Sequence, residues 1–125
     1  MDAATKAFVR ERAKGKCEYC QLAEDDSPLC PLHIEHTIPK SHGGTDESGN
    51  LALACIDCNL HKGPNLAGID PGTELLTRLF NPRSDSWTDH FEWDGIYIVG
   101  KTPIGRVTVN VLKMNAEDQL ALRSA

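Results

Sequence analysis

The sequence lacks the features that mark several protein classes. Its 125 residues contain no apolar run near the roughly 20 residues that a membrane-spanning helix needs. The first twelve residues hold two acids and three bases without an apolar stretch, so they do not resemble a secretory signal. Internal repeats and low-complexity stretches are also missing. With 40% hydrophobic and 25% charged residues, the chain is predicted to be a small globular protein of the cytoplasm without membrane contact.

Positive charge is scarce as well. The chain has 13 Lys and Arg against 18 Asp and Glu, a net charge of −5, which argues against binding nucleic acid by bulk charge. Five of the 13 basic residues nevertheless lie among the first 16. Candidate phosphate contacts are therefore local: Arg10, Arg12, Lys40 and Lys62. For the two arginines, a solvated helix face is an equally good interpretation.

Most of the cysteines lie in closely spaced pairs. Four of the five cysteines form two Cys-x-x-Cys pairs, Cys17 with Cys20 and Cys55 with Cys58, separated by 34 residues. Four thiolates on two tight turns suit a tetrahedral Zn²⁺ ion, and in a reducing compartment such pairs indicate a metal site before disulfides. Plain core packing and a redox dithiol are the alternatives. We interpret the pairs as a structural zinc site, and the remaining Cys30 as a small buried apolar residue.

Hydrophobic periodicity and turn residues predict the elements. A boundary near residue 66 separates a core, 1–66, from a C-terminal extension, 67–125, that is expected to pack on it within one structural domain. The expected elements are a helix over 3–14, a strand over 32–38, a strand over 51–54, a helical turn over 59–62, a hairpin across Asp94-Gly95, a helix beginning after the cap Thr102, and a last helix capped by Asn115.

Polar residues at fixed spacing lie between and beside the cysteine pairs. Asn50 follows His36 by 14 residues, and Asn59 follows Asn50 by nine. The whole motif reads His33-Ile-Glu35-His36, Pro39, Gly43-Gly44, Asn50-Leu51 and Cys55-x-x-Cys58-Asn59-x-x-Lys62-Gly63. This order and spacing resemble the HNH endonuclease family, also called ββα-metal nucleases, over residues 10–65. The resemblance implies an α+β fold in which a four-cysteine zinc site clamps a ββα-metal unit, followed by a hairpin and helix extension.

The resemblance also implies a role for each motif residue. His36 would be the general base that deprotonates water, a task that suits an imidazole with an ordinary pKa of about 6.5. Glu35 and Asn59 would bind a catalytic divalent metal, and Asn50 would fix the loop that orients His36. Carboxylate and amide oxygens favour Mg²⁺ or Mn²⁺. His33 shares a strand face with Glu35 and is a candidate partner for that ligand.

The chain departs from the commonest family pattern at both metal positions. Glu35 stands where Asp is usual, and Asn59 where many members have His. Adjacent residues on an ideal strand point to opposite faces, so Glu35 and His36 serve one site only if the strand twists or ends there. Pro39 and the following glycines are consistent with such an ending.

The sequence thus predicts a metal-dependent endonuclease that cuts or nicks DNA, and the resemblance implies that cleavage leaves 5′-phosphate and 3′-hydroxyl ends. Two alternatives stay open. The first is a non-catalytic zinc module that docks on nucleic acid or protein. The second is an enzyme of the same chemistry acting on RNA, because no residue visibly reads the 2′-hydroxyl. The sequence does not indicate a target or an oligomeric state.

Overall fold

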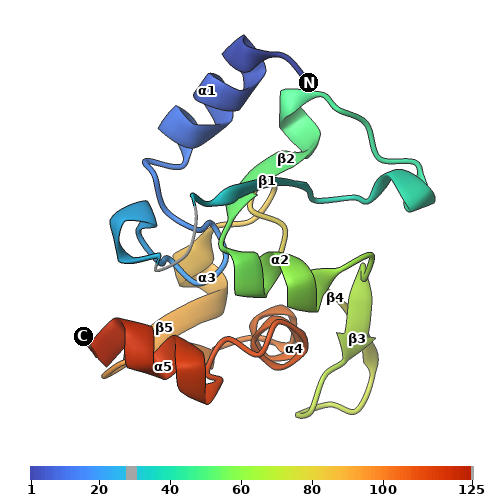
Figure 1. Cartoon of the computed structure of the whole chain (residues 1–125). Helices are drawn as coiled ribbons and strands as arrows, with labels where there is room; N and C mark the ends of the chain where they lie inside the picture. The colour runs from blue at the N-terminus through green and yellow to red at the C-terminus, as the bar shows by residue number, and fades with distance from the viewer. Residues whose placement is uncertain (28–30, 125) are drawn as a thin grey trace.

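The computed structural model describes residues 1–27 and 31–124, so the prediction for Cys30 lies outside the described residues. No helix in the described ranges is long and apolar enough to cross a membrane. The elements, shown in Figure 1, are α1 (Ala3–Arg12), η1 (Glu24–Asp26), β1 (His33–His36), η2 (Lys40–His42), η3 (Ser48–Asn50), β2 (Leu51–Ala54), α2 (Ile56–Lys62), β3 (Ala67–Ile69), β4 (Leu76–Arg78), α3 (Trp87–His90), β5 (Phe91–Asp94), β6 (Tyr97–Gly100), α4 (Pro103–Val111) and α5 (Glu117–Ser124).

The first hairpin and the helix after it form a ββα unit. β1 pairs antiparallel with β2, which places Glu35 opposite Ala52 and His36 opposite Leu51. All four residues of β2 are buried, as its unbroken apolar sequence predicts. β1 is shorter than the predicted strand, because after His36 the chain turns and bonds to the side chain of Asn50. The chain then runs from β2 directly into α2 (Figure 1).

Helix α2 begins three residues earlier than predicted. Cys55 is its N-cap, and the Cys55 sulfur accepts a hydrogen bond of 3.4 Å from the backbone N–H of Cys58. The second cysteine pair is therefore the first turn of the helix rather than a separate knuckle. Gly63 ends the helix with a φ of 50°, a backbone conformation that favours glycine.

Two arginines attach α1 to this unit. The Arg12 guanidinium donates to the carbonyls of Ser48 at 3.1 Å and Leu51 at 2.8 Å. Arg10 forms an ion pair with Glu24 at 2.6 Å and donates to the carbonyl of Leu32 at 2.8 Å. These contacts occupy carbonyls that neither strand uses, so the arginines fix the helix beside the hairpin.

The C-terminal elements largely match the prediction. β5 and β6 pair antiparallel, and because Asp94 is opposite Tyr97 the turn residues are Gly95 and Ile96. The Thr102 hydroxyl accepts a hydrogen bond from the N–H of Gly105 at 3.0 Å and so caps α4, which begins with proline.

Two features of the extension differ from the prediction. The short hairpin of β3 and β4 was not expected, since its strands have three residues each. The predicted cap Asn115 does not cap α5. Its side chain instead donates to the carbonyl of Ile98 at 2.8 Å and accepts from the N–H of Ile98 at 2.9 Å. The asparagine amide thus satisfies backbone groups of β6 that no strand pairs there.

Side chains from both parts of the chain share one hydrophobic cluster. Tyr19 meets Phe80 edge-to-face at 6.3 Å between ring centroids, and Phe80 meets Phe91 at 5.1 Å. The indole N–H of Trp87 donates to the carbonyl of Tyr19 at 2.7 Å. The extension therefore packs directly on the segment that carries the first cysteine pair.

Candidate functional site

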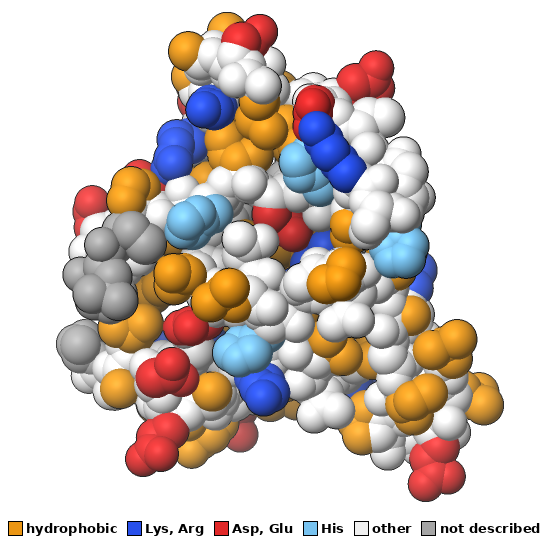
Figure 2. Space-filling view, turned by 45° about the vertical axis from the view of Figure 1, so that its right-hand side comes forward, with side chains coloured by type: hydrophobic (Ala, Val, Ile, Leu, Met, Phe, Trp, Pro, Cys, Tyr) orange, Lys and Arg blue, Asp and Glu red, His pale blue; other side chains and the backbone are white. Residues whose placement is uncertain are grey.

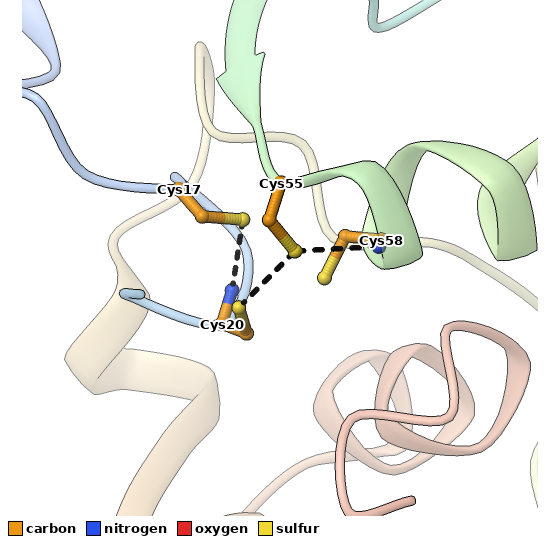
Figure 3. A group of neighbouring side chains, drawn as sticks. All are labelled: Cys17, Cys20, Cys55 and Cys58. Atoms are coloured by element: carbon orange, nitrogen blue, oxygen red, sulfur yellow. Dashed lines mark hydrogen bonds between the residues drawn. The ribbon is translucent and has the colours of Figure 1, made fainter. Parts of the chain in front are cut away.

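The four paired cysteines converge, as the sequence predicted. Cys17 and Cys20 come from the loop after α1, and Cys55 and Cys58 from the start of α2 (Figure 3). Their sulfur atoms all lie within 4.8 Å of one another, and all four residues are buried. Sulfurs bound tetrahedrally to Zn²⁺ at about 2.3 Å would be about 3.8 Å apart. The distance of 3.7 Å between the Cys20 and Cys55 sulfurs fits that arrangement.

The chemistry of the cluster favours a cation over a disulfide. All four cysteines are free, and a sulfur separation of 3.7 Å is far longer than a disulfide bond of about 2.05 Å. Burial raises the pKa of the Cys17 thiol, whereas hydrogen bonds from the neighbouring thiols lower the pKa of Cys55. Four buried sulfurs can all be thiolates only around a positive ion, so the residues present fit a zinc site.

Glu35 lies on the inner side of β1 and is only 6% exposed. The hydroxyl of Tyr19 donates a hydrogen bond to one carboxylate oxygen. The ammonium of Lys62 lies 3.3 Å from the other oxygen and also donates to the carbonyl of His36 at 3.2 Å. Burial raises the pKa of Glu35, and the nearby Lys62 charge opposes that shift. Both oxygens of this carboxylate therefore have specific partners from different segments.

Tyr19 joins the cysteine cluster to this carboxylate. It stands between Cys17 and Cys20 in the sequence, and its side chain is completely buried. A buried ring inside the turn that carries Cys17 and Cys20 has little freedom, so this turn fixes the position of the hydroxyl that donates to Glu35. This role could not be predicted from the sequence, because a tyrosine inside a Cys-x-x-Cys pair is not itself a ligand.

Asn50 fastens the loop between the two strands. Its side-chain oxygen accepts from the Thr37 hydroxyl at 2.8 Å and the Ile38 N–H at 2.9 Å. Its amide nitrogen donates to the carbonyls of Ile38 at 3.0 Å and Thr45 at 2.9 Å. Gly44 is required at this crossing, because a Cβ atom there would lie 1.7 Å from the carbonyl oxygen of Ile38. The clamp links the end of β1 to the far side of the loop.

His36 is the last residue of β1, and its side chain is 24% exposed. Its Nε2 lies 2.7 Å from a carboxylate oxygen of Asp46, whose other oxygen lies 3.0 Å from the Lys40 ammonium. Hydrogen bonds from His36 and Lys40 lower the pKa of Asp46 to about 2. Asp46 was not among the predicted site residues. In the sequence it is one polar residue in a loop of several, and only the fold places it against His36.

The residues expected to hold a second metal are contributed by two neighbouring elements. Glu35 is in β1, and Asn59 is half-buried in α2, three residues before Lys62. A carboxylate and an amide oxygen are hard donors that fit Mg²⁺ or Mn²⁺. Figure 2 shows acidic and basic side chains at the floor of a hollow, with histidines near its rim. In the structure, the cation beside Glu35 is the ammonium of Lys62.

The structure separates the four predicted phosphate contacts. Lys62 is placed in the interior, with 2% exposure, because its ammonium neutralises Glu35. Arg10 and Arg12 are engaged in holding α1. Lys40 is exposed beside Asp46. The predicted partner residue His33 lies exposed on β1, whereas Glu35 on the same strand is buried.

Comparisons with known proteins find similarity over the same segment. The model of the HNH endonuclease family matches residues 17–65, the segment that contains both cysteine pairs and the ββα unit. The chain is also 28% identical over 117 residues to the Septu protein PtuB of Bacillus thuringiensis. That similarity covers 92% of this chain but 42% of the relative, so the chain spans about two fifths of that protein. Residues 17–65 of this chain therefore match the HNH endonuclease family.

Proposed function

We propose that the chain is a metal-dependent endonuclease that hydrolyses DNA phosphodiester bonds, by nicking one strand or cutting both. The observation that carries the proposal is the placement of His36. It ends β1 with a partly exposed imidazole, and the hydrogen bonds of Asn50 fix the loop beside it. The same residues lie within the segment that matches the HNH endonuclease family.

His36 acts as the general base. Its imidazole faces the surface, where water and a phosphodiester can approach, while the neighbouring Glu35 faces inward. An imidazole can accept a proton from water near neutral pH. Asn50 acts indirectly, because its four hydrogen bonds hold the loop on which the surroundings of His36 depend.

Two metal sites belong to the proposal. The four cysteines hold a structural Zn²⁺, which closes the segment from Cys17 to Cys58. Glu35 and Asn59 are the protein ligands for a catalytic Mg²⁺ or Mn²⁺. When bound, such an ion neutralises charge on the phosphate and stabilises the departing 3′ oxygen. Tyr19 keeps the Glu35 carboxylate in place, and Lys62 compensates its charge.

The substrate is bound by few charges. With a net charge of −5, the chain relies on local basic groups, of which Lys40 is exposed next to the His36 site. Few phosphate contacts predict weak binding that decreases as the salt concentration rises. DNA is the proposed substrate, and cleavage leaves 5′-phosphate and 3′-hydroxyl ends.

Supercoiled-plasmid nicking tests the proposal. Zinc-loaded protein is incubated at low salt with Mg²⁺ or Mn²⁺, and a structured RNA is tested under matched conditions. We expect nicked circles that DNA ligase can reseal, because ligation needs 5′-phosphate and 3′-hydroxyl ends. Cleavage of the RNA alone would replace DNA as the substrate. No cleavage of either, with zinc intact, would favour a non-catalytic zinc module.

A further inference from the structure

The contact between His36 and Asp46 is not explained by the motif. Asp46 is held on both sides: one oxygen faces His36 Nε2 at 2.7 Å, and the other lies 3.0 Å from the Lys40 ammonium. The preceding residue, Thr45, accepts from the side chain of Asn50 at 2.9 Å. The carboxylate therefore sits on a loop that Asn50 fastens to the end of β1, and its orientation is set by two cationic or polar partners.

The chemistry of this contact assigns the proton on the imidazole. Hydrogen bonds from His36 and Lys40 hold the pKa of Asp46 at about 2, so this carboxylate is ionised at neutral pH. An ionised carboxylate only accepts hydrogen bonds. The Nε2 atom of His36 must then carry the proton, and in the neutral ring Nδ1 carries the lone pair.

We propose that Asp46 is a positioning residue for His36. Its carboxylate accepts from Nε2–H, fixes the ring plane and leaves Nδ1 to take the proton from water. This inference rests on the proposed nuclease function and deepens it. It also connects Asn50 to His36. The amide of Asn50 donates to the carbonyl of Thr45, and the next residue, Asp46, contacts the imidazole. Lys40 supports the same geometry by holding the second oxygen of Asp46.

Two substitutions at Asp46 separate its charge from its geometry. Asp46→Ala removes both acceptor oxygens, whereas Asp46→Asn keeps the shape of the side chain but offers one oxygen to two donors, His36 Nε2–H and the Lys40 ammonium. Partners that orient an active-site imidazole typically contribute about 10- to 100-fold in activity. We expect Asp46→Ala to lower kcat by at least about tenfold without raising the KM for DNA. Asp46→Asn should recover little of that loss, because its oxygen pairs with Lys40 and its NH2 group then faces Nε2. Glu47→Ala, an exposed acid at the next position, is the matched control and should behave as wild type.

A double substitution shows whether Asp46 acts through His36. If it does, adding Asp46→Ala to His36→Ala lowers the residual activity no further, because the ring that Asp46 positions is already gone. Equal kcat for wild type and Asp46→Ala would overturn the proposal. A further loss in the double variant would do the same, since Asp46 would then act by another route.

Imidazole NMR provides a readout that needs no activity. With ¹⁵N-labelled histidine, the His36 Nε2–H proton should be protected from exchange in wild type and should exchange rapidly in Asp46→Ala. Equally rapid exchange in wild type and Asp46→Ala would overturn the contact. Absence of nicking by wild type would instead overturn the proposed nuclease function, and the spectra would then decide the His36–Asp46 contact by themselves.

Discussion

Two acidic residues near His36 have opposite environments. Glu35 is buried, and its carboxylate is satisfied by Tyr19 and Lys62. Asp46 is exposed and pairs with the imidazole and with Lys40. Burial raises the pKa of Glu35, whereas hydrogen bonds lower that of Asp46. The contrast assigns Glu35 to the interior side of the site and Asp46 to its surface.

Replacing Lys62 with Met should destabilise the protein strongly. The substitution keeps the volume but leaves the buried Glu35 carboxylate without its cation, at a cost of about 3 kcal/mol or more in the free energy of unfolding. Because the pKa of Glu35 is already raised, the loss should shrink at lower pH, where the carboxyl takes a proton. Urea unfolding at several pH values measures both effects.

The exposed Lys6 in α1 provides the control for this experiment. Lys6→Met removes the same charge from the surface and should change stability by less than about 0.5 kcal/mol. If Lys62→Met were as stable as Lys6→Met at neutral pH, the buried pair would not have the role assigned to it.

At the scale of residues, the sequence identifies ligands better than their supports. Spacing alone predicted the cysteine cluster, because two Cys-x-x-Cys turns have few other uses. It also marked Asn50, whose clamp the structure shows. Tyr19 and Asp46 were not predicted, because each acts through a contact that only the folded chain creates. Tyr19 binds Glu35, 16 positions later, and Asp46 binds His36, 10 positions earlier.

At the scale of elements, the hairpin of β3 and β4 depends on a single buried acid. Asp70, at the end of the first strand, receives two hydrogen bonds from the guanidinium of Arg106 in α4, at 3.0 and 2.9 Å. It also accepts from the backbone N–H groups of Gly72 and Thr73. The three-residue strands have little pairing of their own, so this acid both forms the turn and attaches the hairpin to α4.

Acid should weaken this attachment selectively. The hydrogen bonds from Arg106 lower the pKa of Asp70 below its usual 3.8. A lowered pKa contributes stability that is fully present above about pH 4 and is lost as the pH falls through the folded value. The Asp70→Asn side chain cannot ionise, so the free energy of unfolding of this variant should be lower than that of wild type at pH 7. This difference should become smaller below pH 4.

Denaturant unfolding of wild type and Asp70→Asn between pH 3 and 7 measures that gap. Asp89→Asn, at an exposed acid in α3, serves as the control and should follow wild type at every pH. A gap between wild type and Asp70→Asn that stays constant across this range would contradict the assignment.

Element boundaries were predicted where local chemistry sets them. Thr102 followed by proline marked the start of α4, and the apolar run over 51–54 marked β2. The hairpin of β3 and β4 was missed because its stability comes from Arg106, 36 residues after Asp70. Asn115 was predicted to cap α5, but its side-chain amide instead forms hydrogen bonds with the backbone N–H and carbonyl of Ile98.

At the scale of the whole molecule, the cysteine cluster lies where the two parts of the chain meet. Tyr19, between the first two cysteines, packs against Phe80 and binds the indole of Trp87. On α2, Asp57 accepts a hydrogen bond from Gln119 of α5. We therefore propose that residues 1–66 and 67–125 fold as one cooperative unit around the zinc site.

Removing the metal should unfold both parts together. A structural zinc site contributes about 10–16 kcal/mol, as much as the net stability of about 5–15 kcal/mol that a small domain has. Chelation, or Cys58→Ser, should abolish the cooperative transition seen by circular dichroism and by tryptophan fluorescence from the extension. Cys30→Ser, at the unpaired cysteine, should keep one zinc and the transition. Retained tryptophan packing without zinc would show that the extension folds independently.

Plasmid nicking by three proteins tests whether His36 is the base of a nuclease. Wild type, His36→Ala and His42→Ala are compared with Mg²⁺ or Mn²⁺ at low salt, each first shown to hold one zinc. His42 is an exposed histidine of the same loop and is the matched control. Nicking by wild type and His42→Ala that is lost in His36→Ala is the predicted result. Equal nicking by all three proteins would show that His36 is not the base.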